Sequence, residues 1–153
     1  MDNKFAIRLA RIEDAKKLAE FCELLRKSLD MSVHSDKLLS GVSAPIKDRS
    51  KGMYLVATES DNSTLIGCLM ITYEWSDVNN GFYWWIQSVY VDPRWRRMGV
   101  YSALHNRVIN LARSTVNVTR IKLYVHQTNR TAQKTYMSHG MNEAPHKIFE
   151  LYL

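Results

Sequence analysis

Two hydrophobic periodicities alternate along the chain, and they predict its strands and helices. Runs in which every second residue is apolar, rich in β-branched and aromatic side chains, predict strands. These strands span Phe5–Leu9, Met53–Thr58, Leu65–Trp75, Phe82–Asp92, Ile121–His126 and Ile148–Leu153. Apolar residues at helical spacing predict amphipathic helices. The helices span Ile12–Leu29, Gly99–Arg113 and Thr131–His139, with a short one around Leu38–Val42 before a loop at Pro45–Gly52.

The order of these elements predicts one domain over residues 1–153. A strand and one or two helices come first, then a meander of strands, then a helix, a strand, a helix and a strand. One central mixed sheet, mostly antiparallel and flanked by helices, satisfies this order, so the expected class is α/β (α+β). A chain of this length can bury a sizeable core in such a fold.

The stretch from Gln87 to Arg113 joins a strongly patterned strand to the helix that follows it. Pro93 ends the strand, because proline has no N–H for the ladder. The turn contains three arginines, and Gly99 lies where the helix begins. A helix N-terminus offers unpaired N–H groups and the positive end of a dipole, so this turn is suited to phosphate. An ordinary corner with a solvated basic turn is the alternative interpretation.

Two motifs resemble conserved regions of the GNAT N-acetyltransferase family. The first is Arg96-x-x-Gly99-x-Tyr101 after Val89-x-Val91-x-Pro93, which is similar to the acyl-CoA motif of that family. Tyr101 departs from the motif, which usually has a small residue there. The second motif has its residues in the register of the family. These residues are Asn129, Ala132, Tyr136, Gly140 and Met141. The order of the elements also resembles the GNAT fold.

This resemblance implies a site for acetyl-CoA and a direct transfer of its acetyl group to an amine of a small molecule or of a protein. It implies a splay between the strands Phe82–Asp92 and Ile121–His126, where the Val89 N–H would polarise the thioester carbonyl. Tyr136 would act as general acid and protonate the leaving thiolate. The residues implied in binding acetyl-CoA are Val89, Tyr90, Val91, Arg96, Arg97, Met98, Gly99, Val100, Tyr101, Ser102, Asn129, Ala132 and Tyr136.

A general base is harder to assign from the sequence. Several branches of the GNAT family place Glu or His at positions that here hold Trp85 and Gln87, and neither side chain accepts a proton usefully. Gln87 is expected to orient a water molecule instead. A non-catalytic acyl-CoA-binding regulatory module of the same fold is therefore the alternative to an enzyme.

Glu74 is the nearest acid along the sequence. If Glu74 pairs with Tyr83 in the hairpin, Cys68 lies opposite Val89, and Glu74 is then about 20 Å from Val89 at the usual strand rise. That distance is too long for direct proton abstraction, so Glu74 is expected mainly to bind the acceptor.

Charge supports an amine acceptor, because the net charge of +6 is unevenly distributed. No Lys or Arg occurs from Gly52 to Pro93, a stretch that holds Glu74, Asp77 and many aromatic residues. A small cationic amine would meet a favourable potential there. Basic flanks are also compatible with nucleic-acid binding, but we expect that the protein does not bind nucleic acid. The hairpin aromatics are interpreted as core packing, with an acceptor channel or a homodimer interface as alternatives.

The remaining features favour a cytoplasmic protein without metal. The histidines show no metal-ligand spacing. Cys22 and Cys68 fit no paired spacing and are expected to be buried thiols in a reducing compartment, outside the reaction centre. No apolar run approaches the roughly 18 residues of a membrane span. The segment Met1–Lys4 lacks the apolar region of a signal peptide, so a leader is not expected.

Overall fold

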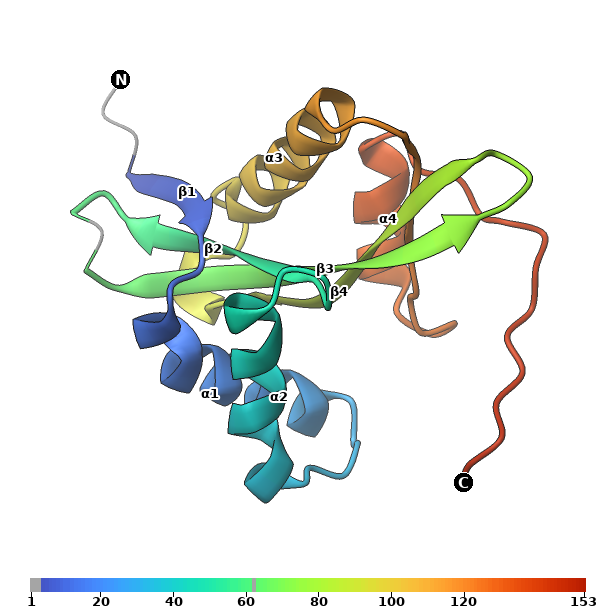
Figure 1. The fold of residues 1–153 in the computed structure, drawn as a ribbon. Coiled ribbons are helices and arrows are strands. Elements are labelled where there is room, and N and C mark those ends of the chain that lie inside the picture. Colours follow the sequence, from blue (N-terminus) through green and yellow to red (C-terminus); the bar gives the residue numbers. More distant parts are fainter. Residues whose placement is uncertain (1–3, 62) are drawn as a thin grey trace.

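The computed structural model describes residues 4–61 and 63–153, and its centre is one five-stranded sheet (Figure 1). Residues 1–3, on which the leader prediction depends, lie outside the described part. The strands follow the order β1-β2-β3-β4-β5, antiparallel except for the parallel pair β4–β5. Their bounds are β1 Phe5–Leu9, β2 Met53–Glu59, β3 Leu65–Ser76, β4 Gly81–Val91 and β5 Val118–Leu123. The predicted mixed, mostly antiparallel sheet is therefore confirmed.

Helices cover both faces of this sheet, with α1 and α2 on one side and α3 on the other (Figure 1). The helices are α1 Ala15–Ser28, α2 Ser35–Lys47, α3 Val100–Ser114 and α4 Arg130–Ser138, and short 3-10 turns occur at Ile12–Asp14 and Pro93–Trp95. Within the described part of the chain, no helix combines the length and apolarity needed to cross a bilayer.

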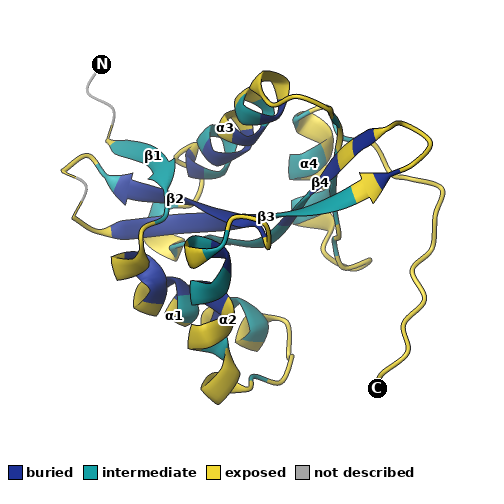
Figure 2. Cartoon of the chain, viewed as in Figure 1, coloured by how far each residue is buried: buried dark blue, intermediate teal, exposed yellow. Residues whose placement is uncertain are grey.

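The core consists of two clusters separated by the sheet. Leu55, Leu69 and Ile86 belong to the cluster that packs against α3, whereas Val56 and Cys68 belong to the one beneath α1 and α2. Strands β2 and β3 are therefore buried on both faces over most of their length (Figure 2). Consecutive apolar residues, rather than strict alternation, are typical of such strands.

Helix α2 is longer than the sequence indicated. The loop predicted from Pro45 begins only after Lys47, because Pro45 lies inside the helix and is buried. An interior proline loses a helical hydrogen bond and usually breaks the helix. Here Val42 and Ile46 pack against the core beneath the sheet, and this tertiary packing outweighs the local cost.

The predicted C-terminal strand is wrong for the isolated chain. Residues Ile148–Leu153 have no regular structure and leave the sheet as an exposed tail (Figures 1 and 2). The strand before α4 also differs, since β5 begins at Val118 and ends at Leu123 rather than at His126. A strand needs a partner for its backbone groups, and β5 is paired with β4 no further than Leu123.

Candidate active site

The register of β4 changes at the point where β4 and β5 separate. Glu74 pairs with Tyr83 as predicted, but Cys68 pairs with Tyr90 and not with Val89, because a bulge lies between Cys68 and Met70. The predicted splay is confirmed, since pairing with β5 ends at Ile86. Among the described residues, neither neighbouring strand supplies a register partner for Val89.

The bulge is held in place from both sides of the sheet. Ser88 has a φ of 51°, a left-handed conformation that accommodates the extra residue of β4. After it, the Tyr90 ring stacks on Phe21 of α1 with centroids 4.6 Å apart. Val89 and Val91 pack against the cluster on the α3 side. Alternate residues of this segment thus pack on opposite faces of the sheet. This packing fixes the backbone although its strand pairing is interrupted.

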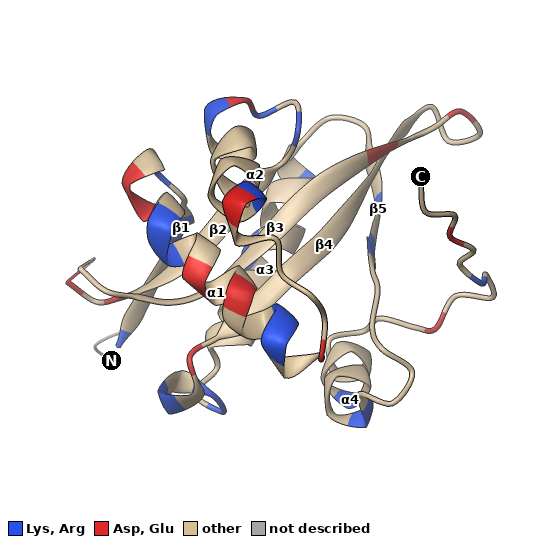
Figure 3. Ribbon diagram, turned by 90° about the horizontal axis from the view of Figure 1, so that it is seen from below, with Lys and Arg blue, Asp and Glu red and all other residues tan. Residues whose placement is uncertain are grey.

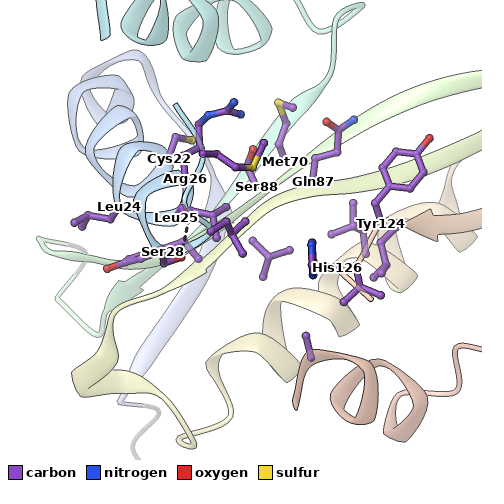
Figure 4. Close-up of a pocket in the computed structure, with 18 of the residues that line it drawn as sticks. Cys22, Leu24, Leu25, Arg26, Ser28, Met70, Gln87, Ser88, Tyr124 and His126 are labelled. Carbon is purple, nitrogen blue, oxygen red and sulfur yellow. Dashed lines mark hydrogen bonds between the residues drawn. The ribbon is translucent and has the colours of Figure 1, made fainter. Parts of the chain in front are cut away.

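A cavity of about 1010 Å³ opens beside the bulge, between the ends of β4 and β5 and the helices α1, α2 and α4 (Figure 4). Its wall includes many of the residues named from the sequence. These residues are Gln87, Val89, Tyr90, Val91, Arg96, Tyr101, Asn129, Ala132 and Tyr136. The cavity lining does not include Arg97, Met98 and Gly99 of the adjoining turn, Val100 and Ser102 at the start of α3, or Glu74.

The turn between β4 and α3 leaves the first backbone N–H groups of α3 without helical hydrogen bonds. The first helical hydrogen bond of α3 runs from the Ala103 N–H to the Gly99 carbonyl. The N–H groups of Val100, Tyr101 and Ser102 therefore have no partner within the helix. Gly99 has a φ of 82°, and a Cβ built on it would meet no described atom within 4 Å. The Arg96 backbone N–H instead donates to Pro93 at 3.4 Å, and its Nε donates to the Val91 carbonyl at 3.0 Å.

Tyr136 reaches the cavity from α4. Asn129 caps this helix by accepting from the Ala132 N–H at 3.1 Å, which occupies its Oδ1. The Tyr136 ring lies 5.7 Å from the ring of Tyr101, measured between centroids. Burial raises the pKa of Tyr136 above its ordinary value. The phenol therefore stays protonated at neutral pH, as a proton donor must.

An aromatic cluster attaches α4 to α3. His139 donates from Nδ1 to the Thr135 carbonyl at 2.8 Å, so in the neutral ring Nε2 accepts from the Ser102 hydroxyl at 2.9 Å. His105 is buried beside His139, with ring centroids 4.9 Å apart. Burial and the neighbouring His139 lower the pKa of His105. Since α4, whose residues are all described, has no fully buried side chain, this cluster is its main anchor.

Glu74 interacts with two other side chains at the far part of the hairpin. It accepts from the Trp85 indole Nε1 at 2.5 Å and from Lys122 at 3.2 Å, and these contacts lower its pKa. The Trp85 ring in turn lies 4.3 Å from that of Tyr124, which lines the cavity. The acidic residues of the hairpin lie toward its tip, away from α4 (Figure 3). Glu74 is therefore connected to the cavity lining through Trp85 and Tyr124.

Gln87 and His126 are polar groups within the cavity (Figure 4). The Gln87 Nε2 donates to the Thr72 hydroxyl at 2.5 Å, which orients the carboxamide. His126, unassigned by the sequence, accepts at Nδ1 from the Thr128 N–H at 3.3 Å. The neutral ring consequently carries its proton on Nε2 and presents a donor, not an acceptor, on that side.

The charge of the lining differs from the expectation of an acidic acceptor region. Among the described residues of the lining there is no Asp or Glu, whereas Arg26, His34 and Lys37 line it from α1, α2 and the segment between them. Sequence reasoning missed these three residues, because their helices approach the bulge only in the folded chain. The charged side chains that line the cavity from α1 and α2, Arg26 and Lys37, are thus both positive.

One cysteine lies closer to the site than expected. Cys22 lines the cavity and lies 3.8 Å from the Tyr54 hydroxyl, so the expectation that both cysteines lie outside was wrong for Cys22. Cys22 belongs to the cluster that α1 and α2 form with the sheet, beside the bulge in β4. Burial raises the pKa of the Cys22 thiol. A buried neutral thiol is a poor nucleophile, so the wall position does not give Cys22 a covalent role.

Comparisons with known proteins agree with this geometry. A model of the acetyltransferase (GNAT) family matches residues 18–141. A "possible acetyltransferase" from Clostridium difficile 630 is 36% identical, with 99% of each chain covered and a TM-score of 0.88. A predicted acetyltransferase from Clostridium acetobutylicum, solved with acetyl-CoA, has the same fold at 19% identity, with 97% and 96% covered and a TM-score of 0.76. No protein of curated function matches significantly.

Proposed function

Because the chain belongs to the GNAT family of acetyltransferases and is an acetyl-CoA-dependent N-acetyltransferase, we propose that it passes the acetyl group directly to an amine bound in this cavity. The observation that carries the proposal is the position of Val89. Both strand registers skip this residue, and it lines the same cavity as Tyr136. A backbone donor and a protonated phenol at one cavity suit thioester aminolysis.

Each step has a named residue in this proposal. The Val89 N–H donates to the thioester oxygen while the acceptor nitrogen attacks the carbonyl carbon, and it holds the negative charge that develops there. The C–S bond then breaks, and Tyr136 gives its phenolic proton to the sulfur. The nitrogen loses its proton to water, and the phenolate regains one from solvent. The N–H groups of Val100, Tyr101 and Ser102 bind the pyrophosphate at the start of α3.

No side chain of the cavity is assigned as general base. Gln87 orients the attacking nitrogen or its water, since Thr72 holds its carboxamide. His126 has its Nδ1 turned to Thr128, which suits a hydrogen bond to the acceptor better than proton abstraction. The reactive form of the acceptor is then the free amine, and turnover rises with pH toward the pKa of that amine.

The acceptor that fits this lining is a small amine that also carries an anionic group. Support comes from Arg26, His34 and Lys37 on the α1–α2 side and from the lack of a carboxylate among the described lining residues. The Arg26 Nε donates to the Ser32 carbonyl at 3.0 Å, which fixes the guanidinium at the cavity wall. A polycationic amine would meet repulsion there.

Paired acceptors test this assignment. Thiol release from acetyl-CoA is measured with amino acids and with the matching amines that lack the carboxylate. We expect kcat/KM to be about tenfold higher for the carboxylate member, the effect of one charged hydrogen bond. Lys37→Gln should reduce the difference in kcat/KM between the paired acceptors. Lys16→Gln is the control, because it makes the same charge change on α1 outside the lining, and it should leave that difference unchanged. A preference for diamines would overturn the assignment, and no thiol release with any amine would overturn the proposed chemistry.

A further inference from the structure

The apolar face of α1 continues beyond the hydrophobic core. Leu18 and Cys22 on this face are buried in the cluster beneath the sheet. Leu25 and Leu29 follow at helical spacing, with Leu29 at the C-cap of the helix. Leu25 is half-buried and Leu29 is 44% exposed, and among the described residues neither joins a core cluster. Both side chains line the cavity instead.

Two more apolar side chains of the lining come from the connection between α1 and α2. Met31 is 46% exposed and Val33 is half-buried. The Arg26 carbonyl accepts from the backbone N–H groups of Leu29 and Met31, at 3.0 Å each. The Arg26 Nε donates to the carbonyl of the next residue, Ser32. These bonds fix the start of the connection, so the four apolar side chains form a prepared surface. We call this surface the apolar wall; it consists of Leu25, Leu29, Met31 and Val33.

The apolar wall and the cations of the lining belong to the same part of the cavity. Figure 4 shows Leu25 on α1 at one end, with Tyr124 and His126 at the other. Arg26 follows Leu25 directly in the sequence, and Lys37 lies in the first turn of α2. The α1–α2 end of the cavity therefore offers apolar surface and positive charge together. This combination suits a ligand that has both an anionic group and an apolar body.

We propose that the acceptor is an amino acid with a large apolar side chain, which packs against the apolar wall while its carboxylate binds Arg26 and Lys37. The inference rests on the proposed transfer to an amine in this cavity and adds the class of side chain. Such a ligand matches the charge of the lining and removes the half-exposed Leu29 and Met31 from water, along with its own apolar surface. An acceptor with a short or polar side chain would leave that surface in water.

A series of amino acids that differ only in the side chain tests the proposal. Thiol release from acetyl-CoA is measured with alanine, valine, leucine and asparagine. We expect kcat/KM to be about tenfold higher for leucine than for alanine, because each buried methylene group contributes up to about fourfold and the wall is partly open to solvent. Asparagine has nearly the size of leucine and should resemble alanine. Equal values across the series, or a preference for asparagine, would overturn the proposal.

Leu29→Ser tests the apolar wall itself. The side chain is half-exposed and outside the core clusters, so the fold should tolerate the change. The ratio of kcat/KM for leucine over alanine should fall from about tenfold to about threefold. Leu39→Ser is the matched control, because Leu39 is 43% exposed on α2 and does not line the cavity. A ratio that falls equally in both variants, or in neither, contradicts the assignment of the wall.

Product binding separates this inference from the proposed chemistry. In the presence of CoA, N-acetyl-leucine should stabilise the protein against heat at about tenfold lower concentration than N-acetyl-alanine, and Leu29→Ser should reduce this difference. Thiol release without the difference overturns the apolar wall alone. The difference without thiol release from any amine keeps the ligand class and overturns the transfer.

The acyl donor is the other ligand that could use an apolar wall. Acetyl-CoA and hexanoyl-CoA are therefore compared with leucine as the acceptor. We expect acetyl-CoA to be the better donor, because the wall is occupied by the side chain of the acceptor. A faster reaction of hexanoyl-CoA, with that advantage lost in Leu29→Ser, would assign the wall to the acyl chain and overturn the proposal.

Discussion

The Ser102 hydroxyl lies 2.9 Å from His139 Nε2, and this contact joins the helix that follows the β4–α3 turn to the helix that carries Tyr136. The turn and Tyr136 belong to separate parts of the chain. Their relative position depends on this hydrogen bond and on the packing of Tyr101 between Tyr136 and His139.

Removal of the Ser102 hydroxyl should therefore affect both stability and the site. Ser102→Ala should lower the free energy of unfolding by about 1 kcal/mol, the usual net value of one hydrogen bond, and should raise the KM for acetyl-CoA. Urea unfolding and initial rates measure these two effects. Ser114→Ala, which removes a hydroxyl bond within the same helix, is the control and should leave KM unchanged.

Gly99→Val should abolish the thermal stabilisation by acetyl-CoA. The new side chain would occupy the approach to the α3 N-terminus, where a Cβ meets no described atom. Gly140→Val is a matched control, because Gly140 has nearly the same φ, +83°, and an equally open Cβ position. Both variants carry the left-handed strain of about 1–2 kcal/mol, but Gly140→Val should keep the stabilisation. Equal acetyl-CoA affinity in a folded Gly99→Val protein would exclude the turn from the site.

Tyr136→Phe should lower kcat by about 10²–10⁴-fold, the usual contribution of a general acid, with little change in acetyl-CoA affinity. Burial raises the pKa of Tyr101 as well, so Tyr101→Phe is the necessary comparison. Within the described part of the chain the Tyr101 hydroxyl has no hydrogen-bond partner, and we expect its loss to leave kcat nearly unchanged. Full activity of Tyr136→Phe would mean that water protonates the thiolate.

Glu74→Gln should change acceptor binding without changing the chemical step. The variant keeps an acceptor for the Trp85 indole but loses the ion pair with Lys122. Because Glu74 holds Trp85, which packs on Tyr124 of the cavity wall, we expect a modestly raised KM for the acceptor and a retained kcat, read from steady-state rates, with Asp77→Asn as the control in the same hairpin. A collapse of kcat with loss of the acidic limb of the pH profile would identify Glu74 as a base instead.

His105 should make the stability of the protein depend on pH below neutrality. Its folded pKa lies below the ordinary value of 6.5, so below about that pH the unfolded chain binds more protons than the folded one. The free energy of unfolding should therefore fall as the pH drops from 6.5 through the folded pKa. His105→Leu should flatten this slope in urea titrations between pH 8 and pH 5, and an unchanged slope would contradict the prediction.

Local patterns in the sequence were enough for most elements of the fold. Strand and helix periodicity, Pro93 and Gly99 act over a few residues, and the structure places β1 to β5, α1, α3 and α4 where these patterns indicated, within a few residues at the ends. Pro45 was misleading because burial of α2 outweighs a local helix breaker. The tail was also misleading, because an alternating segment becomes a strand only when it pairs with another strand, and residues 148–153 are not paired in the structure.

The sequence by itself determined the family motifs and the turn that follows β4, since these depend on residue types at short spacing. The tertiary structure decided the bulge at Ser88, the partners of Glu74 and the positive lining from α1 and α2. The physical reason is distance along the chain. A register shift moves every later pairing by one residue, and the Glu74–Lys122 contact joins residues 48 positions apart. No short-range pattern contains either relationship.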